Sequence, residues 1–414
     1  MKIGIKAKQA ILIGTLCSVA YLAVYIVRNI LGAVTPAMLV EGNVDEAYIG
    51  KISSAFFIFY AVGQLINGVI GDKIKARYMI SLGLLLAGIT NFIFSRIVGT
   101  GTLDLFVYGV TGFFLAMIYG PMTKVVAENT EPIHATRCCL GYTFASLLGS
   151  PLAGLLATYM AWENVFFTGS AALAVMAAIV FGVFLVLERR GIVKYGQYRL
   201  QSKASTGEKP EKWLWLKVLL RRRIVLFALI AVITGIVRTS VVFWLPTYYT
   251  QALGFSAQEA TTVFSVSTLV ISLSAFIAIF IYERLHHNMD LTILIMFSCA
   301  TVAFLGVYFV KQPFVNVALM VLGIMGSNAA TTMLWSNYCP SLKDTGMVSG
   351  ATGFLDFLSY MAAALANLLF SNAVGSIGWG NLILIWFGLM AFGVLISLPW
   401  RRAVAILQRY LISS

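Results

Sequence analysis

Two stretches of the chain repeat each other at a distance of 210 residues. Ile26-Val27-Arg28 is followed by Pro36, eight residues after the arginine, and Ile236-Val237-Arg238 is followed by Pro246 at the same spacing. A chance match between two apolar tripeptides is common, but one with an embedded arginine and a matched proline is much less so. Two repeated halves are the sequence signature of membrane transporters whose binding site lies midway through the bilayer, between the halves.

The composition of the chain supports a membrane protein. Of its 414 residues, 60% are hydrophobic and only 11% are charged, whereas a soluble domain is about 45–50% apolar and about 25% charged. Such a chain cannot cover its surface with polar groups, so most of it must face lipid. The composition therefore excludes a soluble enzyme, a nucleic-acid-binding protein and a disordered adaptor.

Apolar runs of about 20 residues, the length that crosses a bilayer, predict the architecture. We predict an all-α membrane protein of twelve transmembrane helices in two six-helix bundles, residues 1–187 and 224–414, joined by a basic cytoplasmic linker at 188–223. The predicted spans are 9–39, 48–71, 77–98, 103–127, 137–160, 163–187, 224–250, 258–282, 290–310, 313–337, 345–371 and 381–399.

The basic residues predict the orientation of these spans. With the N-terminus in the cytoplasm, 24 of the 29 Lys and Arg residues fall on the cytoplasmic side, three fall on the other side, and two lie within spans. Cytoplasmic loops carry such an excess of basic residues. We therefore predict a multi-pass protein of the inner or plasma membrane with both termini in the cytoplasm, and the net charge of +13 needs no nucleic acid to explain it.

Three charged residues lie within predicted spans, namely Arg28, Arg238 and Asp356. A charge at the bilayer centre costs about 2.5–3.5 kcal/mol or more, so such residues usually face a cavity and serve function. Equivalent positions in the two halves would place the arginines on opposite walls of one cavity, where their planar donor groups suit carboxylate or phosphate oxygens. The alternative is an ion pair between Asp356 and one arginine that holds the halves shut. Asp356 could hold an arginine between transport cycles, or titrate and couple transport to protons.

Polar and aromatic side chains share a helix face with the first arginine. Tyr21, Tyr25 and Arg28 follow at positions i, i+4 and i+7, and Tyr60 and Gln64 in the second predicted span are also four residues apart. Phenols can donate hydrogen bonds to an anion while they pack as aromatic rings. Aromatic packing alone is the alternative for the tyrosines.

The turn after the second predicted span carries a recognisable motif. Residues 68–77 read Gly-Val-Ile-Gly-Asp-Lys-Ile-Lys-Ala-Arg, close to the pattern G-x-x-x-D-[RK]-x-x-x-[RK]. With twelve spans and a long middle loop, the chain resembles the major facilitator superfamily over its whole length. The resemblance implies that Asp72, Lys73 and Arg77 gate the cytoplasmic side. The alternative is that the basic residues merely set the topology.

A narrower resemblance rests on the residues of the spans. Tyr21-x-x-x-Tyr25-x-x-Arg28-Asn29, with Tyr60 and Arg238, resembles the organophosphate:phosphate antiporters, which include the glycerol-3-phosphate and hexose-phosphate transporters. That family implies that paired arginines bind phosphate while a phosphate ester is exchanged for inorganic phosphate. The chain departs from the glycerol-3-phosphate members at four positions, because Gln64 replaces a lysine, Ser146 a histidine, Gly235 a tyrosine and Asp356 a glycine.

We therefore expect a secondary transporter of a small organic anion, a phosphate ester exchanged for inorganic phosphate, that works as a monomer in the lipid bilayer. The alternatives are a proton-coupled symporter of another organic anion, such as a carboxylate, that uses Asp356, and a receptor of the same fold that gives no flux. A phosphate-cradling G-x-x-x-x-G-K-[ST] loop and a G-x-S-x-G elbow are both absent from the sequence, so we expect neither ATP-driven transport nor an enzyme. The three histidines fall in predicted turns, and no cysteine or carboxylate cluster occurs at ligand spacing, so we expect no metal site and no cofactor.

Overall fold

A computed structural model describes residues 5–41, 44–71, 74–195, 222–342 and 348–398. Every regular element within these ranges is a helix. Most of the predicted linker, 196–221, and the motif residues Asp72 and Lys73 lie outside the described residues. In chain order the helices are α1 (Ile5–Val40), α2 (Glu46–Gly71), α3 (Ala76–Ile97), α4 (Thr102–Leu115), α5 (Tyr119–Asn129), α6 (Pro132–Tyr159), α7 (Trp162–Arg189), α10 (Ile224–Gly235), η1 (Ile236–Val241), α11 (Val242–Gln251), α12 (Ala257–Ser272), α13 (Ser274–Arg284), α14 (Met289–Phe309), α15 (Pro313–Met333), η2 (Leu334–Tyr338), α16 (Cys339–Ser341) and α17 (Val348–Ser397).

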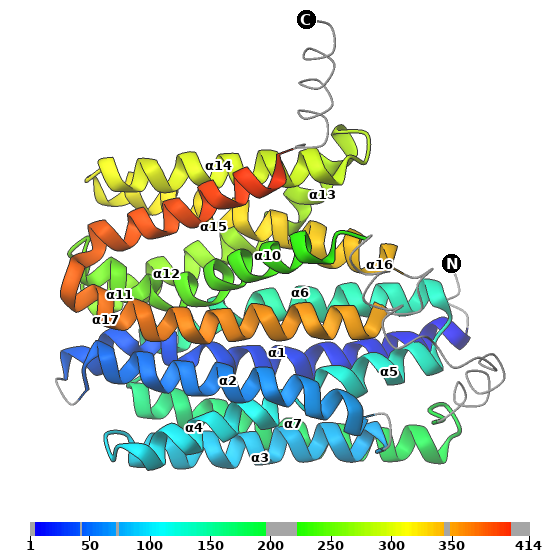
Figure 1. The fold of residues 1–414 in the computed structure, drawn as a ribbon. Coiled ribbons are helices and arrows are strands. Elements are labelled where there is room, and N and C mark those ends of the chain that lie inside the picture. The colour runs from blue at the N-terminus through cyan, green and yellow to red at the C-terminus, as the bar shows by residue number, and fades with distance from the viewer. Residues whose placement is uncertain (1–4, 42–43, 72–73, 196–221, 343–347, 399–414) are drawn as a thin grey trace, which may run out of the picture.

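Eleven helical stretches in the described part of the chain are long and apolar enough to cross a membrane. The last of them contains two crossings. Helix α17 has 50 residues, about 75 Å at 1.5 Å per residue, which is more than twice the apolar thickness of a bilayer. It breaks at Gly378, whose φ of 73° and ψ of 169° are conformations that favour glycine, and the chain folds back there (Figure 1). The two arms on either side of Gly378 correspond to the predicted spans 345–371 and 381–399 as far as these residues are described.

Several predicted spans contain a local break. The fourth span consists of α4 and α5, which are separated at residues 116–118, and the eighth consists of α12 and α13, which are separated at Leu273. The seventh and tenth contain the π-helical turns η1 and η2. A π-helical turn adds a residue to a helix without ending it and is frequent at functional sites.

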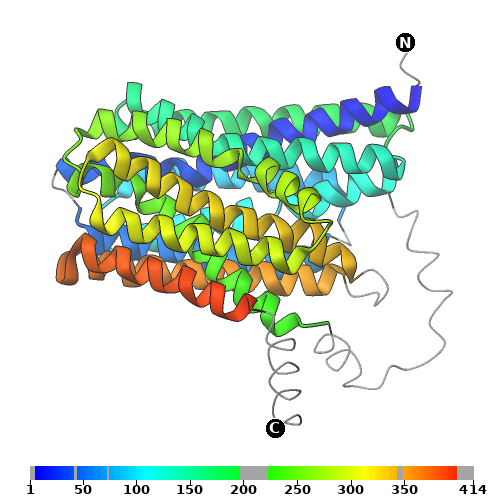
Figure 2. The same cartoon turned by 90° about the horizontal axis from the view of Figure 1, so that it is seen from above.

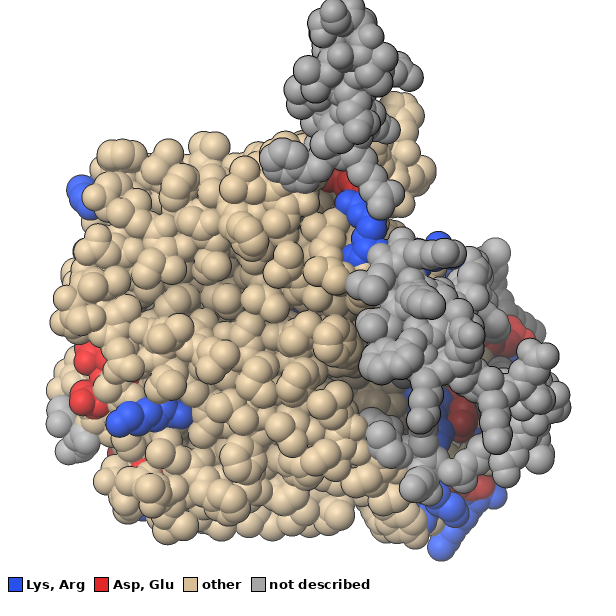
Figure 3. Space-filling view, viewed as in Figure 1, with Lys and Arg blue, Asp and Glu red and all other residues tan. Residues whose placement is uncertain are grey.

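The surface of the bundle is apolar in its middle. Large hydrophobic side chains are exposed along many helices, with Val302 70% exposed, Phe309 69% and Phe314 66%. Figure 3 shows a wide band of uncharged residues on one face, with charged residues toward the two ends of the helices. Exposed apolar area of this extent is suited to lipid contact rather than to water.

The helices run roughly parallel to one another (Figures 1 and 2). Helix α1 packs along α6, α3 along α7 and α2 along α4, whereas α14 packs along α15 and along the second arm of α17. Contacts between the first six spans and the last six are made by α2 with α17, α6 with α12, and α1 with α11. We call the end where α1 begins and α7 ends the N-terminal face, and the end where α1 stops and α2 begins the opposite face.

Hydrogen bonds join the two sets of helices toward the opposite face. The side-chain amide of Gln251 donates to Glu46 at 2.6 Å, and the hydroxyl of Thr158 donates to Thr261 at 3.1 Å. Close helix contact accompanies these bonds, because a Cβ built on Gly154 of α6 would lie 2.2 Å from the Oγ of Ser265 on α12. Three ion pairs at the N-terminal face, by contrast, each join helices of the same set of six, Lys6 with Glu131, Arg77 with Glu188, and Arg223 with Asp290.

Candidate functional site

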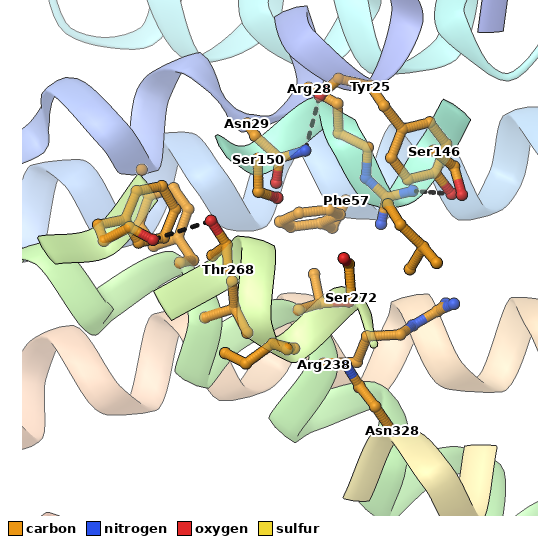
Figure 4. A pocket seen from close by; sticks show the side chains of 17 residues that line it. Tyr25, Arg28, Asn29, Phe57, Ser146, Ser150, Arg238, Thr268, Ser272 and Asn328 are labelled. Carbon is orange, nitrogen blue, oxygen red and sulfur yellow. Dashed lines mark hydrogen bonds between the residues drawn. The ribbon is translucent and has the colours of Figure 1, made fainter. Parts of the chain in front are cut away.

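A cavity of about 120 Å³ lies between helices of the two sets. Its wall is built from α1, α2, α6, η1, α11, α12 and α15, so it is completed only when the two sets of helices meet. The volume is room for several water molecules or a small solute rather than for a drug-sized ligand. The polar or charged side chains on its wall are Tyr25, Arg28, Asn29, Ser146, Ser150, Arg238, Thr239, Thr268, Ser272 and Asn328 (Figure 4).

Arg28 of α1 is held by phenols and aromatic rings. Only 8% of the residue is exposed, and its Nη1 donates to the hydroxyl of Tyr360 at 2.9 Å and to that of Tyr25 at 3.2 Å. Its guanidinium carbon lies 4.6–5.5 Å from the ring centres of Tyr25, Phe57, Tyr60 and Tyr360. A cation–π contact of a desolvated guanidinium contributes about 2 kcal/mol, so these rings help to stabilise a charge that has no carboxylate within 4.0 Å among the described residues.

Arg238 lies on the π-helical turn η1, where the chain departs from regular α-helix. Its Nη2 donates to the Tyr360 hydroxyl at 3.4 Å, and its guanidinium carbon is 5.8 Å from the centre of that ring. Helix α17 approaches very closely beside this turn, because a Cβ on Gly235 would lie 2.2 Å from the Oγ of Ser359. A tyrosine at position 235 would not fit in this arrangement.

Tyr360 of α17 links the two arginines and is the residue that the sequence analysis missed. Its hydroxyl accepts hydrogen bonds from both guanidinium groups, and the residue is 3% exposed. One signal could have found it, because Tyr360 follows Asp356 by four residues and therefore shares its helix face. Among 18 tyrosines, no other feature of the sequence distinguishes it.

Asp356 lies one helical turn before Tyr360. It interacts electrostatically with Arg238 and with Arg28, yet among the described residues no carboxylate lies within 4.0 Å of either guanidinium group. A tight ion pair between Asp356 and an arginine is therefore not the arrangement found. The side chain is half-buried.

The remaining predicted site residues lie at different distances from the cavity. Tyr25 is on its wall. Tyr60 is buried behind it and contacts Arg28, and its ring centre is 4.9 Å from that of Tyr360. Tyr21 packs edge-on against Tyr25 at 4.9 Å and does not line the cavity. Gln64 is half-buried on α2, one turn beyond Tyr60, and is not among the residues of the cavity wall.

The guanidinium groups keep donors available to a ligand. The bonds from Arg28 and Arg238 to the described residues use one nitrogen of each group, whereas a guanidinium has five N–H donors. Thr239 and Asn328, also on the wall, each have an enclosed oxygen that finds no partner among the described residues. Two positive charges near one acidic residue leave the cavity with an excess of positive charge, which favours an anion.

Arg77, the one described member of the predicted gate, pairs with Glu188 of α7 at 2.9 Å. The side chains of the pair are 8% and 15% exposed, so this is a buried ion pair. Tyr195 donates a further hydrogen bond to Glu188 at 2.8 Å, and burial together with this bond raises the pKa of the Tyr195 phenol. In this conformation Arg77 therefore joins α3 to α7 within the first six spans. Nothing in the described residues brings together three or more potential metal ligands.

Comparison with known proteins identifies the family of the chain. The family description "Major Facilitator Superfamily" matches residues 17–367. The chain is 24% identical to the glycerol-3-phosphate transporter of Bacillus subtilis, over 92% of this chain and 90% of that one. It is 23% identical to the membrane sensor protein UhpC of Escherichia coli, with 92% and 90% covered, and 23% identical to the phosphoglycerate transporter protein of Salmonella typhimurium, with 93% and 87% covered.

Solved structures share the fold at low sequence identity. An inward-facing, occupied bacterial homologue of the human lysosomal transporter Spinster superposes with a TM-score of 0.72 at 12% identity, covering 93% of this chain and 95% of that one. A D-xylose–proton symporter gives a TM-score of 0.69 at 13% identity, with 95% and 98% covered.

Proposed function

Since the chain belongs to the major facilitator superfamily, we propose that it is a secondary active transporter that exchanges a small phosphate ester for inorganic phosphate. Arg28 and Arg238 are the proposed anion clamp, and Tyr25, Tyr60 and Tyr21 support it. One observation carries this proposal. The arginines of the first and seventh spans meet at a single cavity and at a single hydroxyl, that of Tyr360.

The chemistry of the clamp follows from its donors. Phosphate offers several acceptor oxygens, and a guanidinium can donate two parallel hydrogen bonds to two of them. A phosphate bound between the arginines would take over the acceptor role of the Tyr360 hydroxyl and would hold one wall of the cavity to the other. Because each arginine belongs to a different set of helices, anion binding favours the conformation in which the sets lie close together, as alternating access requires.

The names of similar proteins support a phosphate ester as the substrate. Two of the similar proteins are named as transporters of glycerol-3-phosphate and of phosphoglycerate, and both esters carry a phosphate that would suit the paired arginines. Another similar protein is named as a membrane sensor, so binding alone does not establish transport. We propose transport rather than catalysis or sensing, and an experiment must measure flux.

We further propose that residues 1–187 and 224–414 move as two bundles joined by the linker 188–223. The distribution of basic residues supports a cytoplasmic N-terminal face in a cell membrane. The bonds from Gln251 to Glu46 and from Thr158 to Thr261 then close the extracellular side of the site. We propose that the protein works as a monomer and that Asp72, Lys73 and Arg77 act at the cytoplasmic gate.

A second candidate, a proton-coupled symporter, is favoured by Asp356. This carboxylate lies beside the arginines without a tight ion pair, so it is free to bind and release a proton during transport. A symporter of this kind would accumulate its anion when a pH gradient is imposed and would need no phosphate on the other side of the membrane.

Flux in proteoliposomes tests the proposal. Purified protein is reconstituted into vesicles loaded with labelled inorganic phosphate, and efflux is followed when phosphate, glycerol-3-phosphate, a hexose phosphate or a simple carboxylate is added outside. We expect phosphate and at least one ester to stimulate efflux, with no dependence on an imposed pH gradient. Binding without stimulated efflux would indicate a receptor, and anion uptake that follows the pH gradient would indicate the symporter.

A further inference from the structure

An acidic group lies on the same helix face as Tyr360, outside the wall of the cavity that Arg28 and Arg238 line. Asp356 lies one helical turn from Tyr360, about 6 Å along the helix axis at 1.5 Å per residue. A site that binds phosphate alone does not need this carboxylate.

Neither arginine neutralises Asp356 at close range. Both interact with it electrostatically, but within the described ranges no carboxylate oxygen lies within 4.0 Å of either guanidinium group. The residue is partly exposed, so a ligand can reach it. A carboxylate without a tight partner favours a cation that arrives from outside.

The surroundings of Asp356 are also suited to a cation. The ring of Tyr360 lies one helical turn away on the same face of α17, and the ring of Tyr60 is 4.9 Å from that of Tyr360. Tyr119 is 39% exposed, and its ring packs 5.6 Å from that of Tyr21. Aromatic faces attract ammonium groups through cation–π contacts.

The net charge of the arginines and Asp356 also favours a ligand that carries an ammonium group. Two arginines and one aspartate leave one positive charge if all three are ionised. A doubly charged phosphate ester that also carries one ammonium group has a net charge of minus one and leaves the site neutral. An ester without the ammonium group would leave one negative charge next to Asp356, which is unfavourable where water is scarce.

We propose that the substrate of this chain is a zwitterionic phosphate ester, with its phosphate between Arg28 and Arg238 and its ammonium group at Asp356. This inference rests on the proposed phosphate exchange and names the class of ester. The ligand spans the distance from the arginine pair to the next helical turn, toward the N-terminal face. Selectivity arises because an ester with an uncharged end leaves Asp356 without a partner.

Two esters of nearly equal shape test the inference. In 2-aminoethyl phosphate the terminal group is an ammonium, and in propyl phosphate it is a methyl group. Vesicles loaded with labelled phosphate are exposed to each ester, and the concentration that gives half-maximal efflux is measured. We expect 2-aminoethyl phosphate to act at a concentration at least about tenfold lower, as a lost charged hydrogen bond implies.

Substitution of Asp356 tests whether this residue causes the preference for 2-aminoethyl phosphate. Asp356→Asn should reduce the tenfold preference to less than about threefold, whereas Asp356→Glu, which keeps the charge, should retain a preference for the ammonium ester. If the Asn variant carries no flux, the same ratio is read from the shifts that the two esters cause in the thermal unfolding of the purified variant. Asp290→Asn is the matched control, because Asp290 pairs with Arg223 at 2.7 Å on the exposed N-terminal face, and it should leave the preference unchanged.

The outcomes separate this inference from the proposed function. Phosphate exchange in the wild type without a preference for 2-aminoethyl phosphate overturns the inference and leaves the exchange intact. A preference that persists in Asp356→Asn also overturns it. Absence of phosphate exchange in the wild type overturns the proposed function and the inference with it, and uptake that follows a pH gradient and is lost in Asp356→Asn assigns the carboxylate to proton coupling instead.

Discussion

The hydroxyl of Tyr360 accepts a hydrogen bond of 2.9 Å from Arg28, a residue 332 positions earlier in the chain. The same hydroxyl accepts a bond of 3.4 Å from Arg238. One neutral oxygen thus lies where two positively charged groups from different parts of the chain converge. Because this oxygen is the only acceptor that the described residues offer to both arginines, an anion with several oxygens would bind the pair more strongly than the phenol does.

The first prediction concerns the clamp itself. Arg28→Lys and Arg238→Lys each keep the positive charge but lose the planar pair of donors. Hydrogen bonds to charged groups contribute about 1.5–3 kcal/mol, so each variant should exchange phosphate at least about tenfold more slowly at subsaturating ligand. Initial rates of labelled-phosphate efflux from proteoliposomes measure this effect.

Arg96→Lys is the control for the clamp variants. Arg96 stacks over Phe92 on α3 and does not line the cavity, so this variant should exchange phosphate at the wild-type rate. Near-normal exchange by both Arg28→Lys and Arg238→Lys would rule out the clamp.

The second prediction concerns the shared acceptor. Tyr360→Phe keeps the ring beside both guanidinium groups and removes only the oxygen that orients them. Each hydrogen bond to a charged group is worth about 1.5 kcal/mol or more, and the cation–π contacts remain, so we expect phosphate exchange to fall at least about tenfold. Tyr338→Phe removes a hydroxyl that bonds to the carbonyl of Arg222 away from the cavity, and its exchange should match the wild type. Equal rates in the two variants would contradict an orienting role for Tyr360.

The sequence carried more information about the arginines than about what surrounds them. The repeat of Ile-Val-Arg with a matched proline predicted that Arg28 and Arg238 occupy equivalent positions, and both line one cavity. Asp356 could also be identified from the sequence, because a charged residue is unusual in an apolar span. Tyr360 could not be found this way, because a tyrosine in a membrane helix has an ordinary packing role and only the tertiary structure brings it to both arginines.

Local breaks in the helices were also beyond the reach of sequence patterns. Hydropathy predicted the spans because lipid requires long apolar runs. The break at Leu273 and the π-helical turn at η1 carry no proline. At η1 the hydroxyl of Ser240 donates to the carbonyl of Ala363 on α17, a tertiary contact that no sequence pattern shows. The end of α7 lies at Arg189 rather than at 187, because Glu188 remains helical and pairs with Arg77.

The third prediction concerns the buried ion pair of α3 and α7. Arg77→Gln leaves Glu188 buried without its partner, and an unpaired buried charge costs about 3–5 kcal/mol. We expect a clear loss of thermal stability in detergent, measured by the unfolding of the purified protein. The double variant with Glu188→Gln should recover much of the loss. Arg223→Gln disrupts an exposed pair with Asp290 and should cost less than about 1 kcal/mol; similar losses in the two single variants would contradict the special position of Arg77.

The last prediction concerns the contact that closes the opposite face. A Cβ on Gly154 would lie 2.2 Å from the Oγ of Ser265 and 3.0 Å from the ring of Phe264, so Gly154→Val forces α6 and α12 apart at this point. Overpacking of this kind costs about 1–3 kcal/mol, enough to shift a population of conformations by about five- to 150-fold. We expect slower phosphate exchange and easier access to the cavity from the side of the opposite face.

Labelling of a cysteine on the cavity wall measures that access. In a background without other cysteines, Thr268→Cys is treated with a membrane-impermeant maleimide added on the side of the opposite face, with and without Gly154→Val. Gly182→Val on α7 is the matched control, because a Cβ built there meets nothing within 4 Å among the described residues. Gly154→Val should raise the labelling rate at least about fivefold and Gly182→Val should not, whereas equal rates would show that the contact between Gly154 and Ser265 does not close this side of the site.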